Sequence, residues 1–139
     1  MKWKVKIKNK SGVQNNMVTI KVKEVVQYAG HSLRANGSVN LTVKAMYSEL
    51  TNSVQMMQML NNDVDLRAKL VNGKPMRLGY FRIQEIKVDG DGESTIKFNG
   101  ISDNVEMDNL NNLPLNDADT KQFTILAVAD IEEEENEEE

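Results

Sequence analysis

The sequence predicts a mainly β (α+β) protein built around an antiparallel curved sheet. Apolar and polar residues alternate with a period of two over much of the chain, which is typical of strands with one buried face. Asn-Gly pairs at 36–37 and 72–73 separate such runs and are strong hairpin signals. The 3.6-residue period of a helix is clear in one stretch only, so strands are expected to supply most of the core.

The first third of the chain contains three alternating runs. Apolar residues occupy every second position in residues 3–7, 18–22 and 39–45, with lysine, threonine or asparagine between them. Turn-forming residues lie between the first two runs, at 11–16. This order predicts a three-stranded antiparallel meander, in which Gly30 marks a bulge or a bend.

The period changes after the third run. Residues 48–61, SELTNSVQMMQMLN, fit a helix with Ser48 as its N-cap. Leu50, Val54 and Met57 are spaced i, i+4 and i+7, so we expect them to form the buried stripe of that helix. The sequence therefore predicts one helix directly after the third strand.

The rest of the chain returns to the period of strands. Residues 64–71, 76–88, 94–101 and 121–131 predict four more strands, and 103–113 predicts a second short helix. Three strands, a helix and two strands is the order of an OB-fold, so an OB-like arrangement is the first expectation. The additional strands do not belong to that pattern, and a small barrel or a β-sandwich with an inserted helix fits equally well.

Charge divides the chain more sharply than its net value of -4 shows. Residues 1–45 hold nine Lys and Arg against one acid, which gives +8, and residues 46–129 hold eight against twelve, which gives -4. Residues 130–139 hold eight acids and no base, which gives -8. We therefore expect a single β-rich domain over 1–129 and a disordered acidic tail over 130–139.

Composition excludes several protein classes. The chain has no cysteine, so neither disulfides nor a thiolate zinc site can hold the fold. No stretch approaches the 18 apolar residues of a membrane span, and the N-terminus lacks the unbroken apolar stretch of a secretory signal. We expect a cytoplasmic protein with no membrane contact.

The sequence does not predict an enzyme. His31 is the one histidine, and neither a Gly-x-Ser-x-Gly elbow nor a Walker loop is present. Asp89, Asp91 and Glu93 alternate like the first ligands of a calcium loop. The Gly and Glu that complete such a loop are replaced by Ser94 and by a glycine at position 100. A solvated hairpin turn is the favoured interpretation, so we expect no catalytic residue, no metal and no cofactor.

Alternating lysines near the N-terminus are the main functional signal. A lysine-rich outer face protects an edge strand from pairing with another chain, or it binds the phosphates of a nucleic acid. Under the second interpretation the strand at 17–28 pairs with the first strand and adds two lysines. The predicted nucleic-acid-binding residues are Lys2, Lys4, Lys6, Lys8, Lys21 and Lys23.

Exposed aromatic rings are the second requirement of a single-strand binder, because bases stack on them. The chain has seven aromatic residues, and Trp3 lies opposite the lysines by strand parity. Tyr80 and Phe81 are adjacent, so they must face opposite sides of a strand. One of the two rings can therefore be exposed, close to Arg77 or Arg82.

Two other features suggest contacts with partners. Met56 and Met59 lie off the expected helical stripe, and methionine adapts to irregular partner surfaces, although core packing on a wide apolar face also explains them. The acidic run suggests a solubility tail, or a tethered polyanion that competes for the basic face or docks on a basic partner. The predicted partner-contact residues are Met56, Met59, Glu132, Glu133, Glu134 and Glu135.

Together these patterns favour a non-enzymatic binding module. The expected ligand is single-stranded nucleic acid, bound independently of sequence, with the acidic tail regulating access or docking partners. The alternative is a phage-like structural or protein-interaction protein, a virion component or a host-factor binder, with no nucleic-acid contact. It would lie within a virion or in the cytoplasm, and its methionines would mark a contact with a protein partner or a second copy.

Overall fold

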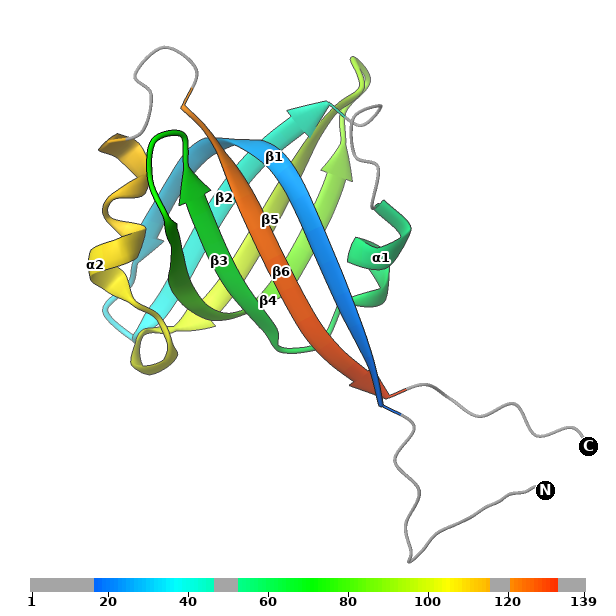
Figure 1. Cartoon of the computed structure of the whole chain (residues 1–139), viewed down its shortest axis with the longest axis horizontal. Coiled ribbons are helices and arrows are strands. Elements are labelled where there is room, and N and C mark those ends of the chain that lie inside the picture. Colours follow the sequence, from blue (N-terminus) through cyan, green and yellow to red (C-terminus); the bar gives the residue numbers. More distant parts are fainter. Residues whose placement is uncertain (1–16, 47–52, 116–120, 133–139) are drawn as a thin grey trace, which may run out of the picture.

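The computed structural model describes residues 17–46, 53–115 and 121–132 (Figure 1). The strands are β1 (Met17–Leu33), β2 (Ser38–Met46), β3 (Val64–Leu70), β4 (Pro75–Val88), β5 (Glu93–Ile101) and β6 (Gln122–Glu132). The helical segments are α1 (Ser53–Gln58), η2 (Ser102–Asn104), α2 (Met107–Leu110) and η3 (Leu113–Leu115). None of the described helices is long and apolar enough to cross a membrane.

The six strands form one antiparallel sheet that closes on itself. Their order around the ring is β1-β2-β5-β4-β3-β6, and β6 pairs with β1 to complete it. The predicted mainly β fold with a curved antiparallel sheet is confirmed. The ring has one described strand more than the five of an OB-fold, so a small barrel is the better description among the expected architectures.

Tight turns connect neighbouring strands where the sequence predicts them. Gly37 has a φ of 89°, and its N–H donates to the Arg34 carbonyl oxygen at 2.9 Å, which closes the turn between β1 and β2. Gly73 donates in the same way to Leu70 at 3.1 Å between β3 and β4. Gly30 lies where the β1–β2 register shifts, so the predicted bulge is also confirmed.

The core fills the interior of the ring. Strand alternation sends every second side chain inward, and the Phe81 and Phe98 rings meet edge to face with centroids 6.3 Å apart. Each fully buried large apolar side chain contributes roughly 1.5–3 kcal/mol. The largest of them are Phe81, Phe98, Phe123, Leu41, Met56, Met59, Leu66, Leu78, Ile96, Leu110, Leu113 and Ile125.

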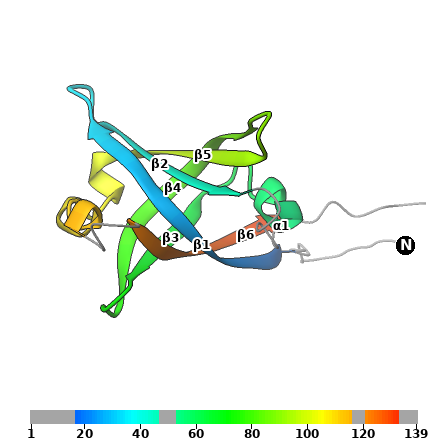
Figure 2. The same ribbon diagram turned by 90° about the horizontal axis from the view of Figure 1, so that it is seen from above.

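Helical segments lie at opposite sides of the ring in both views (Figures 1 and 2). On one side Met56 of α1 and Met59 just after it join the core, and on the other side Leu110 and Leu113 do so. Because a ring of strands leaves its ends open, these apolar side chains close the core at both ends. The helical segments are short, yet they complete the burial that the strands begin.

The orientation of α1 corrects two expectations. Val54 and Met57 were expected in the buried stripe but are 66% and 59% exposed, whereas Met56 and Met59 are fully buried. Residues 3–8 and 47–52, which contain the predicted first strand and the start of the helix, lie outside the described residues. Met56 and Met59 therefore pack in the core, so they do not offer the partner surface predicted for them.

The boundary of the acidic tail also differs from the expected one. β6 runs to Glu132, and Ile131 packs against the core, so residues 130–132 belong to the sheet and not to the tail. Inward-facing apolar residues continue along the strand to this point, which explains why the pairing continues as well. Glu133, Glu134 and Glu135 lie outside the described residues.

Candidate nucleic-acid interface

The structure describes two of the six predicted phosphate-binding lysines. Lys21 and Lys23 are exposed on the outward face of β1, as strand alternation requires. Lys2, Lys4, Lys6 and Lys8 lie outside the described residues. The predicted pairing of the first strand with β1 therefore stays a prediction.

A continuous row of outward positions connects Lys21 with the exposed tyrosine. Lys21 is opposite Val128 of β6, Val128 is opposite Asp65 of β3, and Asp65 is opposite Tyr80 of β4. Neighbouring strands are about 4.8 Å apart, so three steps place Lys21 roughly 14 Å from Tyr80 along the sheet. The two predicted features share one outer surface, although a carboxylate lies between them.

Tyr80 is the exposed ring of the Tyr80–Phe81 pair, a choice that the sequence did not decide. Its side chain is 47% exposed, whereas Phe81 is 1% exposed, so the prediction that the two rings face opposite sides is confirmed. The Arg77 guanidinium lies 4.7 Å from the Tyr80 ring centroid, which is a cation–π contact. Arg77 also forms ion pairs with Asp65 at 3.6 Å and with Glu106 at 3.5 Å. These ion pairs hold the guanidinium in place against the Tyr80 ring.

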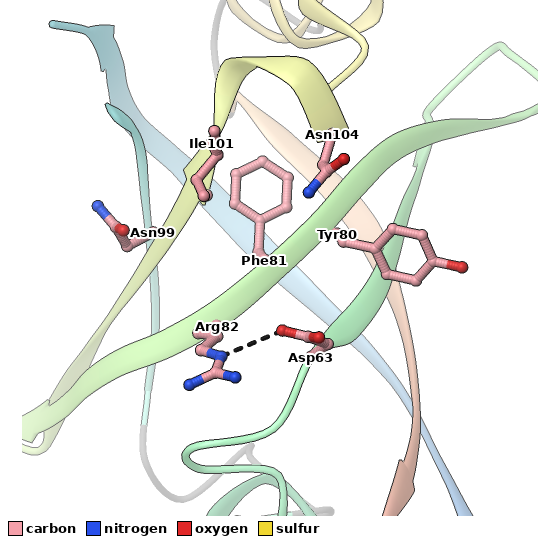
Figure 3. A pocket seen from close by; sticks show the side chains of 8 residues that line it. Asp63, Tyr80, Phe81, Arg82, Asn99, Ile101 and Asn104 are labelled. Atoms are coloured by element: carbon pink, nitrogen blue, oxygen red, sulfur yellow. Dashed lines mark hydrogen bonds and ion pairs between the residues drawn. The ribbon is translucent and has the colours of Figure 1, made fainter. Parts of the chain in front are cut away.

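A pocket opens in the wall of the ring beside Tyr80 (Figure 3). The β4–β5 register runs only as far as Arg82 and Asn99, and beyond this pair β4 bonds to β3 while β5 bonds to β2. The pairing of these two strands therefore ends here, and the buried Phe81 ring lies between them (Figure 3). We call this opening the wall pocket. Its lining includes Asp63, Tyr80, Phe81, Arg82, Asn99, Ile101 and Asn104.

Two glycines allow close packing at this pocket. Gly79 has a φ of 125°, and a Cβ there would lie 2.3 Å from the Asn104 carbonyl oxygen. A Cβ on Gly100 would lie 2.9 Å from the Tyr80 carbonyl oxygen and 3.1 Å from the Phe81 ring. These contacts leave no room for a side chain at either position. Glycine at 79 therefore allows η2 to pack against β4, and glycine at 100 allows β5 to pass close to β4. The loop in turn brings Asn104 to the rim of the pocket.

The wall pocket is electrically balanced and mixed in polarity. Its cation, Arg82, donates from Nε to an Asp63 carboxylate oxygen at 3.1 Å (Figure 3). Tyr80 and Ile101 contribute apolar surface, Ile101 being 60% exposed, and the buried Phe81 lies behind them in the lining. Its volume of about 430 Å³ lies within the range of small-ligand sites. Such a pocket suits a flat, uncharged ring with polar edges.

Two side-chain amides supply hydrogen-bonding groups at this rim. Asn99 uses both amide hydrogens, donating to Ser38 Oγ at 3.0 Å and to Asn40 Oδ1 at 2.7 Å. Its own carbonyl oxygen therefore remains as an acceptor. Within the described part of the chain, the Asn104 side chain has no hydrogen bond. No pattern in the sequence indicates these asparagines, because only the β2–β5 pairing and the η2 loop bring them to one rim.

Comparisons with protein-family models, curated protein sequences and solved structures found no match to this chain. The chemistry of its surface is therefore the guide to function.

The acidic hairpin turn is explained by local structure. Carboxylate oxygens of Asp89, Asp91 and Glu93 lie within 4.8 Å of one another. Asp91 Oδ1 accepts the Glu93 N–H at 3.0 Å, and Lys87 lies 3.8 Å from Asp89. These are the contacts of a hairpin turn in which an aspartate bonds the backbone two residues ahead.

His31 is engaged in a hydrogen-bonded chain at the β1 bulge. Its Nε2 lies 2.8 Å from Asn111 Oδ1, and its Nδ1 lies 2.6 Å from the Tyr28 hydroxyl. An amide oxygen only accepts, so Nε2 donates to Asn111, and in that tautomer Nδ1 accepts from the Tyr28 hydroxyl. Burial raises the pKa of Tyr28 above 10.0, while a hydrogen bond with the His31 backbone acts in the opposite direction. These contacts tie β1 to the segment after α2.

Proposed function

We propose that this protein is a non-enzymatic module that binds single-stranded nucleic acid largely independently of sequence. The observation that carries the proposal is the exposed Tyr80 ring, held by Arg77 at the mouth of the wall pocket. Every base has an aromatic face, so stacking on a fixed ring tolerates any sequence. Arg82 and the rim asparagines supply polar contacts beside it.

Basic residues support the same proposal. Lys21 and Lys23 lie on the outward face of β1, and the chain carries five more lysines in residues 1–10. Phosphate contacts by four to six lysines would release counterions from the nucleic acid, so log K would fall with log salt with a slope of about -3 to -4. A salt titration of wild-type binding measures this slope, and binding indifferent to salt would contradict the proposal.

Replacing Tyr80 tests whether its ring stacks on the bases of the nucleic acid. We expect Tyr80→Ala to weaken binding of a labelled single-stranded oligonucleotide by about 1–3 kcal/mol per stacked base. That loss corresponds to roughly 5- to 150-fold in fluorescence-anisotropy titrations. Tyr80→Phe keeps the ring and should bind nearly as wild type does.

Val88→Ala provides a matched control for this test. Val88 is 48% exposed at the other end of β4, so its loss removes a similar exposed side chain away from the pocket. We expect its affinity to equal that of wild type. Equal losses in Tyr80→Ala and Val88→Ala, or no loss in either, would remove Tyr80 as the stacking platform.

A protein-interaction role is the second candidate. Val54 and Met57 expose apolar side chains on α1, and exposed apolar side chains are common in contacts between proteins. Light scattering of the full chain tests self-association directly. Val54→Gln combined with Met57→Gln should lower the measured mass if these side chains hold two copies together, and a monomeric wild type would remove that version.

A further inference from the structure

The wall pocket has a polar hollow on each side, and the two hollows differ in charge. The first lies over β2, β5 and β4, shares Asn99 with the wall pocket, and is lined by Arg34, Asn40, Gln84 and Lys97 among others. We call it the amide hollow. The second lies over β3, β4 and β6 and shares Asp63, Tyr80 and Arg82 with the wall pocket. We call it the acidic hollow.

The charges favour one of the two hollows for a polyanion. Two cations and no acid line the amide hollow. One cation, Arg82, and three acids, Asp63, Asp65 and Asp130, line the acidic hollow. Phosphate groups would be repelled by the three carboxylates, and Arg82 is already paired with Asp63 at 3.1 Å. A nucleic-acid strand that enters the wall pocket is therefore directed toward β5 and β2.

The side chains of the amide hollow offer positive charge and hydrogen-bonding groups to an anionic ligand. Within the described residues, the Arg34 guanidinium forms no ion pair, so it is available to a phosphate. Lys97 is partly balanced by Glu85 at 3.5 Å. Asn99 is fixed by its bonds to Ser38 and Asn40, and it borders both the wall pocket and the amide hollow.

We propose that the wall pocket takes one base and that the amide hollow takes the adjoining sugar and phosphate, so that the strand runs from Tyr80 across β5 and β2 toward Arg34. This inference rests on the proposed function and adds the path of the ligand. The wall pocket is neutral and partly apolar, as a base requires, and the amide hollow is cationic, as a phosphate requires. From β4 to β2 is two strand spacings, about 10 Å, so a short oligonucleotide can reach both.

Arginine replacements on the two sides of the pocket test this path. Arg34→Ala removes a cation from the amide hollow. Arg67→Ala is its matched control, because Arg67 is an exposed arginine on β3, beside the acidic hollow. Affinity for an oligothymidylate of about eight nucleotides is measured by anisotropy over a range of salt concentrations. We expect Arg34→Ala to weaken binding and to make the salt slope shallower by about 0.7, the value of one lost phosphate contact.

The control variants separate the path from the function itself. Arg67→Ala should keep the wild-type slope, and Asn104→Ala should weaken binding without changing the slope, because Asn104 carries no charge. If Arg67→Ala or Lys21→Ala makes the salt slope shallower while Arg34→Ala does not, the path is overturned and the proposed function stands. If the wild-type protein binds no oligonucleotide, or if its affinity is the same at all salt concentrations, the path and the proposed function are both overturned. Affinity that does not depend on salt is the behaviour expected for an uncharged ligand such as an oligosaccharide.

Discussion

Gly79 and Gly100 show how single residues decide the shape of the candidate site. Both lie where the β4–β5 pairing ends, and at each of them a Cβ would lie under 3.0 Å from a backbone atom. A side chain at Gly79 would collide with the loop containing η2, and one at Gly100 would collide with the backbone of β4. The shape of the wall pocket and the position of Asn104 therefore depend on having glycine at positions 79 and 100.

Gly79→Ala is expected to destabilise the protein strongly. The substitution forces a side chain against the Asn104 carbonyl oxygen, and it places alanine at a φ of 125° that residues other than glycine rarely adopt. The steric clash and the backbone strain together cost roughly 2–5 kcal/mol. Urea unfolding of the variant measures the loss. Gly90→Ala is the control, because a Cβ there meets nothing within 4 Å, and its stability should change by less than about 0.5 kcal/mol. Equal stability of the two variants would contradict the proposed role of Gly79.

Tyr28 is expected to make stability depend on alkaline pH. Burial raises the pKa of its phenol, so the unfolded chain loses this proton at a lower pH than the folded protein. The contribution of Tyr28 is then complete below pH 10.0 and is lost as pH rises through the folded pKa. Tyr28→Phe should cost about 0.5–1.5 kcal/mol near neutral pH, through the lost hydrogen bond to His31.

The difference between wild type and Tyr28→Phe isolates this group from the other residues that titrate in base. Urea unfolding of both proteins at increasing pH should show their free energies of unfolding converging as Tyr28 ionises. A constant difference throughout the alkaline range would show that Tyr28 keeps its ordinary pKa in the folded protein.

At the scale of elements, α1 shows that helical spacing does not by itself identify the buried face. Leu50, Val54 and Met57 fit one stripe, and Met56 and Met59 fit another at i and i+3. The helix spans six residues, Ser53–Gln58, so few of its side chains can reach the core. Contact with the end of the ring selects the methionine face.

Polar replacements on the two faces of α1 should give opposite results. Met56→Gln combined with Met59→Gln places two amides in the core, which is expected to cost roughly 1–3 kcal/mol for each side chain. Val54→Gln combined with Met57→Gln changes exposed positions and should alter stability by less than about 0.5 kcal/mol for each. Thermal or urea unfolding compares them, and a tolerated Met56/Met59 double variant would contradict this orientation.

At the scale of the whole molecule, the sheet places its first and last residues side by side. Met17 is opposite Glu132 in the β1–β6 register, so β1 begins beside the point where β6 ends, at one end of the sheet (Figure 1). Residues 1–16 carry five lysines and no acid, and residues 133–139 carry six glutamates and no base. Tethering opposite charges at neighbouring points gives a high effective concentration of one near the other.

Removal of residues 133–139 is therefore expected to tighten nucleic-acid binding. The cut follows Glu132, since a cut after Ala129 would remove part of β6. The gain should be largest at low salt and shrink as salt rises, because screening acts over about 10 Å at 0.1 M. Anisotropy titrations of both chain lengths at two salt concentrations measure it. The same affinity for both lengths would leave the acidic segment as a solubility tail.

The sequence by itself determined the strand character, the turns and the parity of faces. Alternation with a period of two is a local property, so it correctly predicted the strands and hairpins from residue 17 onward and the opposite faces of Tyr80 and Phe81. Glycine beside asparagine is likewise a local signal, and the turns after residues 33 and 70 follow from it.

The tertiary structure alone decided the closure of the sheet, the buried face of α1 and the candidate site. Asn99 and Asn104 line one pocket with Tyr80 and Asp63 because β4 pairs with β5 only from Arg82 onward and with β3 before it, and no local pattern records which strand pairs with which. The opposite charges of the two hollows arise in the same way, from strands that are distant in sequence. Long-range pairing is fixed by the burial of the whole core, so it appears only when the ring is complete.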